Sequence, residues 1–349
     1  MHLSRLLRAR SDIHQDAFRS SNPDECYDGF VLALPLIWIA CALAGLLYAG
    51  EQNIPFRLAV AALPAFLLEA TFYAILGIET WRTRIERLPP AAVAALLTAA
   101  AAAPYCAASF AFGSFQWHAL AWIAGLAAIA AFWYAILPRK APVDLAFLLL
   151  MAVVVLTNIL RKQYVNPMPR LRLDELAALM WIRTGAFAML SVRRTKGVGF
   201  GFWPHRWEWM IGVSYFLALL PVAAAAAWII GFASPHLAAG GWDKTTVLAL
   251  GTFFGVLWVL ALGEEFFFRG LLQQWMSEWL RSQWLGLAAT SLLFGAVHLW
   301  FHSFPNWRFA VLATVAGVFY GLAFRQARSI RASMVTHALT VTTWRLFFS

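Results

Sequence analysis

The chain has 349 residues, of which 62% are hydrophobic and only 13% are charged, and its formal net charge is +10. A typical soluble domain carries about 25% charged residues, so this composition excludes an ordinary soluble enzyme. The basic residues lie in short links between apolar runs, where they fit topology signals and contact with anionic headgroups of a lipid bilayer. We therefore expect no nucleic-acid partner. Three cysteines without metal-type spacing predict neither a disulfide framework nor a zinc ribbon.

Apolar runs of roughly membrane-spanning length follow one another along the chain. They cover residues 30–49, 54–77, 90–112, 116–138, 143–160, 174–192, 208–234, 245–263, 284–303, 308–324 and 330–348. This pattern predicts an all-α, polytopic transmembrane helix bundle of about ten to eleven spans. The weakest run is 174–192, because Arg183 lies in its middle. If run 174–192 crosses the membrane, the positive-inside rule places the N-terminus and the face that carries Glu264 in the cytoplasm. Only the basic link 161–172 would then lie on the other side of the membrane, against this rule.

The composition divides the chain into three predicted parts. Residues 1–29 hold four arginines and no apolar core, which indicates a cytoplasmic leader. Residues 30–173 are predicted to be accessory N-terminal transmembrane helices, in which Glu69, Asp144 and Asn158 are isolated polar residues with a structural or interfacial role. Residues 174–349 are predicted to be the functional core, since their runs contain His, Glu, Arg, Ser and Thr.

The first candidate group is "GEEFFFRG", which follows the apolar run 245–263. On a helix Glu265 and Arg269 are four residues apart and can form an ion pair, while Glu264 points about 100° away. The arginine would hold one glutamate ionised, and the poorly solvated neighbour would serve as a general base. From Phe268 to Arg281 apolar residues recur at helical spacing, which predicts an amphipathic helix along the membrane interface or at the rim of a bundle.

Two later runs bring histidines. In "FGAVHLWFH", Phe294 and His298 share one helix face and His302 lies one turn further, and "SMVTHALTVTTW" contains His337. A lone intramembrane histidine usually makes a contact between helices. However, buried ionisable groups need partners, and these runs offer partners to one another. A Glu–His pair with a second histidine can activate a water molecule and stabilise an oxyanion, which fits peptide-bond hydrolysis within a membrane.

The three motifs "EEFFFR", "FGAVH" and the histidine of "HALTV" resemble those of the CAAX protease and bacteriocin-processing family. That family contains glutamate-dependent intramembrane endopeptidases, including the type II CAAX prenyl endopeptidases. The motifs span roughly the last 100 residues, and the family core would cover about 174–348. The resemblance implies an intramembrane endopeptidase that needs no cofactor and acts on membrane-embedded or lipid-modified polypeptides.

The resemblance also implies a role for each matching residue. Glu264 would be the general base that activates the water, helped by His298, while Glu265 and Arg269 would hold the geometry and charge of the site. Phe294 would pack beside His298, on the substrate side of the site, and His337 would stabilise the oxyanion.

One position departs from the family pattern. The family often places Asn four residues after the last histidine as a second oxyanion donor, and this chain has Val341 there. Thr340 or Thr342 would have to replace it. Loss of one such donor can cost a factor of about 10²–10³ in rate.

A narrower resemblance rests on "LMWIR", "FGFWPHRWEW" and "HALTVTTW". These segments look like members of the family that accompany bacterial exosortase protein-sorting systems. They imply a multi-pass protein of the bacterial plasma membrane with a protein-sorting system as partner.

Other functions stay open. A zinc-dependent protease would use the H-x-x-x-H pair His298 and His302, completed by His337 or Glu264, although Leu299 stands where an H-E-x-x-H motif needs glutamate. A non-catalytic scaffold or immunity-type factor would bind a peptide or lipidated partner in the same polar pocket. A transporter is less supported, because the two halves show no matched pair of broken spans.

Overall fold

The computed structural model describes residues 23–232, 242–301 and 304–348. His302 and residues 1–22 of the predicted leader lie outside these ranges. The first described helix, α2 (Pro23–Glu51), begins before the apolar run that starts at residue 30.

The described part of the chain is all-α, and each predicted apolar run is helical over most of its length. The N-terminal helices are α2, α3 (Phe56–Gly77), α4 (Glu79–Ile85), α5 (Pro90–Ala111), α6 (Trp117–Ile136), α7 (Ala141–Thr157) and α8 (Glu175–Phe187). The C-terminal helices are α9 (Arg206–Ile229), α10 (Trp242–Gly255), α11 (Leu262–Glu265), α12 (Gln274–Trp279), α13 (Gln283–Val297), α14 (Trp307–Ala327) and α15 (Ile330–Phe347). The predicted all-α fold is confirmed.

Eight helices of the described residues are long and apolar enough to cross a membrane. They start at Ala33, Phe56, Pro90, Trp117, Glu175, Arg206, Thr245 and Trp307. Helix α7 is apolar but has 17 residues, and α13 has 15, so these two are short for a span. The protein is therefore an integral, multi-pass membrane protein.

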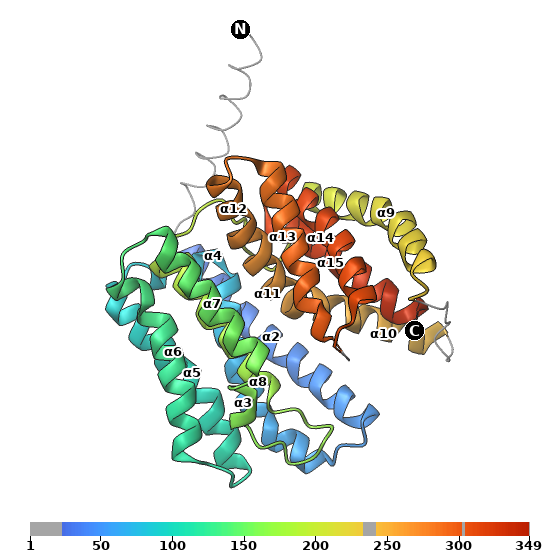
Figure 1. Ribbon diagram of the computed structural model, residues 1–349. Helices are drawn as coiled ribbons and strands as arrows, with labels where there is room; N and C mark the ends of the chain where they lie inside the picture. The colour runs from blue at the N-terminus through green and yellow to red at the C-terminus, as the bar shows by residue number, and fades with distance from the viewer. Residues whose placement is uncertain (1–22, 233–241, 302–303, 349) are drawn as a thin grey trace.

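The helices gather in two groups. Helices α3, α5, α6, α7 and α8 lie together on one side, and α9, α13, α14 and α15 lie on the other (Figure 1). Helix α8 packs against α3, α5 and α6, although the sequence placed it in the core that starts at residue 174. Its Ile182 also reaches α11, since a Cβ added to Gly263 would lie 3.0 Å from the Ile182 side chain. Helix α8 thus contacts both groups, and the predicted domain boundary stays a prediction.

Two of the isolated polar residues of the N-terminal part, Glu69 and Asp144, have charged partners that the sequence did not reveal. Arg183 on α8 donates to both carboxylate oxygens of Glu69 on α3, at 2.7 and 3.1 Å, and both side chains are about 1% exposed. Arg193 likewise lies 2.7 Å from Asp144. The pairing explains how α8 tolerates a central arginine: a buried charge is retained where an opposite charge and hydrogen bonds meet it.

Residues 245–279 form one continuous helix, which contains two π-helical segments, η3 (Val256–Ala261) and η4 (Phe266–Gln273). The predicted interfacial helix from Phe268 to Arg281 is therefore not a separate element. Most of η4 is buried inside the bundle, including Arg269 and Gln273, so its polar face meets protein and not the membrane surface. π-Helical turns of this kind are frequent at functional sites.

Helices α13 and α15, which carry the later motifs, and α14 between them begin at capping side chains. Ser282, Asn306 and Ser329 accept hydrogen bonds from the first turns of α13, α14 and α15. Helices α13 and α14 approach closely because Gly295 has no Cβ. A Cβ at this position would overlap the Thr314 hydroxyl oxygen. This packing brings the C-terminal motifs onto one buried region.

Candidate active site

The two adjacent glutamates lie on α11, the single α-helical turn between η3 and η4. Glu265 is fully buried, whereas the Glu264 side chain is 29% exposed. The sequence predicted that the glutamate not paired with Arg269, Glu264, would be the poorly solvated one. The structure shows the opposite burial: the glutamate paired with arginine is fully buried, and the Glu264 side chain is partly exposed, although its Oε2 atom is buried.

Arg269 is held on several sides. Its Nε lies 3.3 Å from Glu265 Oε2, as the spacing of four residues predicted, and one of its terminal nitrogens donates to the Gly317 carbonyl at 3.0 Å. The guanidinium also lies 4.4 Å from the Phe294 ring centroid, a cation–π contact. With 0% exposure for both side chains, the pair fixes the negative charge of Glu265 in the bundle interior.

His337 on α15 lies between the two glutamates. Its Nδ1 is 2.8 Å from Glu265 Oε1, and its Nε2 is 3.9 Å from Glu264 Oε2. Because an ionised carboxylate can only accept, Nδ1 carries a proton in this contact. The predicted meeting of the "EEFFFR" glutamates with the late histidine is therefore present, and Nε2 is the nitrogen that faces the exposed carboxylate.

His298 lies at the C-terminal end of α13. Its Nδ1 is 2.6 Å from the Phe294 carbonyl oxygen, which can only accept, so Nδ1 carries the proton and neutral His298 has its lone pair on Nε2. The Phe294 ring centroid is 4.7 Å from the His298 ring and 6.0 Å from the His337 ring. The Phe294 ring therefore contacts both imidazoles.

Tyr320 on α14 is a site residue that the sequence analysis missed. Its ring stacks on His337 at 4.5 Å with an interplanar angle of 16°, and the Arg269 guanidinium lies 5.4 Å from its centroid. Gly317 and Gly321 flank it at a spacing of four residues, a small-residue pattern that allows close helix packing. This pattern in "AGVFYGLAF" was the available signal that α14 approaches the site.

The residue that would replace the missing Asn is not evident from the contacts. Thr340 donates its hydroxyl to the Thr336 carbonyl at 2.7 Å, so its proton is already committed. The Thr342 hydroxyl is buried and has no partner among the described residues, but no described contact links it to the glutamates or His337. Val341 is partly buried.

Several buried polar atoms of the site have no hydrogen-bond partner within the described chain. They are Oε2 of both glutamates together with Nε and one terminal nitrogen of Arg269. Glu265 Oε2 and Arg269 Nε form an ion pair at 3.3 Å, so Glu264 Oε2 and the terminal nitrogen of Arg269 are the atoms that call for a polar ligand or water. The described residues contain no cluster of three His, Cys, Asp or Glu side chains that could hold a metal ion. His302, the second member of the predicted H-x-x-x-H pair, lies outside them.

Comparison with known proteins gives one family. Residues 246–343 match the model of the family described as type II CAAX prenyl endopeptidase Rce1-like. No curated protein and no solved structure matches the chain. The matched segment runs from α10 to α15 and contains Glu264, His298 and His337. The C-terminal part of this membrane protein is thus similar to the Rce1-like type II CAAX prenyl endopeptidases, the family that its three motifs predicted.

Proposed function

We propose that the protein is an intramembrane endopeptidase that hydrolyses peptide bonds of membrane-associated or lipid-modified polypeptides by means of a glutamate-activated water. The observation that carries this proposal is the position of His337 between a buried, arginine-paired Glu265 and a partly exposed Glu264. The family match over residues 246–343 supports the reaction class. We further propose that it acts in the bacterial plasma membrane together with a protein-sorting system, as the narrower resemblance implies.

The reaction begins at Glu264. Its carboxylate takes a proton from water, and the lone pair on His298 Nε2 accepts the second hydrogen bond of that water and orients it. The resulting hydroxide attacks the peptide carbonyl carbon, and the carbonyl oxygen becomes an oxyanion. As the tetrahedral intermediate breaks down, Glu264 returns its proton to the leaving amine, which leaves a new carboxyl terminus and a new amino terminus.

His337 is suited to the oxyanion. A proton on Nδ1 is committed to Glu265, so a second proton on Nε2 makes the ring a cationic donor toward the reacting centre. The Glu265 carboxylate and the face of the Tyr320 ring both lie against this imidazole and hold it in place. Arg269 in turn keeps Glu265 ionised, so the buried pair acts on the reaction through His337.

The test is proteolysis in the membrane of origin. Membrane-protein termini are compared between cells with the natural chain, Glu264→Gln and His298→Ala, with and without a chelator. Glu278→Gln is the matched control, because Glu278 lies on the same continuous helix but is exposed. We expect termini that disappear in Glu264→Gln and His298→Ala, persist in Glu278→Gln and resist chelation. Loss on chelation would instead support the zinc-dependent reading, and termini that are all independent of Glu264 would overturn the protease.

The second candidate is a non-catalytic scaffold or immunity-type factor that binds a peptide or lipidated partner in the same pocket. Val341, in place of the usual second oxyanion donor, is the observation that favours it. Partner binding, measured by co-purification, would survive Glu264→Gln in a scaffold, together with the cellular phenotype.

A further inference from the structure

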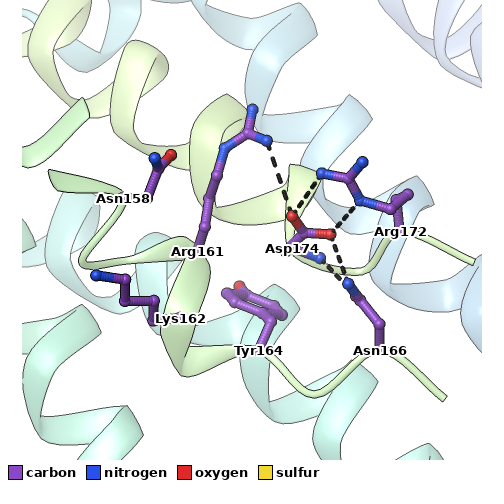
Figure 2. A pocket seen from close by; sticks show the side chains of 7 residues that line it. All are labelled: Asn158, Arg161, Lys162, Tyr164, Asn166, Arg172 and Asp174. Atoms are coloured by element: carbon purple, nitrogen blue, oxygen red, sulfur yellow. Dashed lines mark hydrogen bonds and ion pairs between the residues drawn. The ribbon is translucent and has the colours of Figure 1, made fainter. Parts of the chain in front are cut away.

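A second polar site lies far along the chain from the glutamates, in the link between α7 and α8. It is a pocket with a volume of about 350 Å³ (Figure 2). All seven residues that line it have polar side chains: Asn158, Arg161, Lys162, Tyr164, Asn166, Arg172 and Asp174. In a chain with 62% hydrophobic residues, a pocket lined only by polar side chains indicates a polar ligand.

Two arginines of the pocket are held in place by ion pairs. Arg161 binds both carboxylate oxygens of Glu175, at 3.0 and 2.8 Å, and Arg172 binds both of Asp174, at 2.8 Å each. The hydrogen bond from Arg172 holds the pKa of the Asp174 carboxyl below its ordinary value. Asp174 also accepts a hydrogen bond from Asn166 at 2.9 Å, so the one carboxylate of the lining is already surrounded by donors (Figure 2).

The remaining lining groups offer donors that are not used within the protein. The exposed Lys162 ammonium and the Asn158 amide make no side-chain hydrogen bond or ion pair with the described residues. The Tyr164 ring also lines the pocket, but this side chain is only 7% exposed and its hydroxyl is buried among the helices, so it does not open into the pocket.

The pocket lies at one end of the N-terminal helix group. The link that forms it is tied to the α2–α3 turn, since the Tyr48 hydroxyl donates to the Arg170 carbonyl and Arg170 donates to the Gln52 carbonyl, at 3.1 and 3.2 Å. Helices α2, α3, α7 and α8 therefore begin or end around it. The ends of membrane-spanning helices lie at the level of the lipid headgroups, so the pocket lies at that level as well.

We propose that this pocket binds a phosphate group, carried either by a lipid headgroup or by free phosphate. A phosphate group presents anionic oxygens that accept hydrogen bonds, and the unused groups of the pocket are an ammonium and an amide that donate. The lining has three positive charges and one negative charge, and Glu175, which pairs with Arg161, adds a second negative charge, so the cluster keeps one net positive charge, that of Lys162. The proposal does not depend on proteolysis, and its failure would leave the protease proposal standing.

The experiment measures binding to the full chain in a non-ionic detergent by calorimetry. The probes are inorganic phosphate, short-chain phosphatidic acid and a diacylglycerol with the same acyl chains but no phosphate. We expect phosphatidic acid or phosphate to bind and diacylglycerol not to bind. Lys162→Ala should weaken binding about tenfold, the loss of one hydrogen bond to a charged group. Lys140→Ala, which removes an exposed lysine from the α6–α7 link at the other end of α7, should leave binding unchanged.

Tyr164→Phe removes only a buried hydroxyl that does not open into the pocket. It should leave binding unchanged and serves as a second control. Binding of inorganic phosphate alone would identify free phosphate as the source, and binding of phosphatidic acid alone would identify a headgroup. The proposal would be overturned if neither probe bound, or if Lys140→Ala weakened binding as much as Lys162→Ala.

Discussion

The imidazole of His337 lies flat on the Tyr320 ring, with centroids 4.5 Å apart, while its Nδ1 is 2.8 Å from Glu265. The stacking fixes the plane of the histidine, and the carboxylate fixes its rotation within that plane. Nε2 therefore has one direction in which to donate, toward the region of Glu264. The orientation of this one donor therefore depends on residues of three helices, α11, α14 and α15.

The stacking predicts different outcomes for two substitutions of Tyr320. Tyr320→Phe keeps the ring, so it should retain most of the activity. Tyr320→Leu loses the plane that orients His337 and should lower kcat by about 10- to 100-fold, as expected for a misplaced catalytic group. The split between kcat and KM is the decisive measurement, because loss of the plane that orients His337 should lower kcat and leave KM unchanged. Tyr215→Leu on α9 serves as the control, and an unchanged kcat in Tyr320→Leu would contradict the assigned role.

The two glutamates should differ in their effect on stability. Glu265→Gln leaves Arg269 buried without its ion partner, which should cost about 3–5 kcal/mol of unfolding free energy. Glu264→Gln changes a partly exposed side chain and should cost less than about 1 kcal/mol while it abolishes proteolysis. Unfolding in detergent, followed by circular dichroism with Glu278→Gln as control, measures both. Equal destabilisation by the two changes would show that Glu264 is also a structural residue.

The buried pair of Glu69 and Arg183 should behave as one unit. Either Glu69→Leu or Arg183→Met alone strands the other group in the bundle interior and should cost about 3–5 kcal/mol. The combination of Glu69→Leu with Arg183→Met removes both charges and should recover most of that loss. A double-mutant cycle on unfolding free energies gives the coupling. Additive losses would mean that the two side chains contribute independently.

Val341 offers a gain of function. If the site lacks a second oxyanion donor, Val341→Asn should raise kcat, by up to about 10²–10³ if the new amide reaches the oxyanion fully. Val341→Leu, which adds volume without a donor, is the control. A rise in kcat with unchanged unfolding temperature would locate the oxyanion beside His337. No rise would indicate that another group, such as the unpartnered Thr342 hydroxyl, already donates.

Asp174 predicts a dependence of stability on pH. Its folded pKa is lowered, mainly by the hydrogen bond from Arg172, below the ordinary value of 3.8. The group therefore contributes stability that is present above pH 3.8 and is lost as the pH falls through its folded pKa. Unfolding temperatures of the natural chain and Asp174→Asn should differ at pH 6 and converge below pH 3.8. A difference that stays constant with pH would contradict the prediction.

By itself the sequence determined the class of the protein and the identity of its chemical groups. Long apolar runs can satisfy their backbone only as helices in lipid, so the all-α membrane fold followed from composition and spacing. Glu265 and Arg269 are one helical turn apart, so their ion pair followed from local geometry as well. The three motifs indicated the family, because their residue types and order carry the chemistry.

Only the tertiary structure decided which groups meet across helices and which face water. Arg183 made its apolar run the weakest predicted span. Only the structure shows that Glu69, 114 residues earlier, is its buried partner. Tyr320 gave no chemical signal of its own, because stacking depends on how α14 crosses α15. The burial of Glu265 and the exposure of Glu264 likewise depend on neighbours that are distant in sequence. Pairing and solvation of charges are properties of packing, and local periodicity does not specify them.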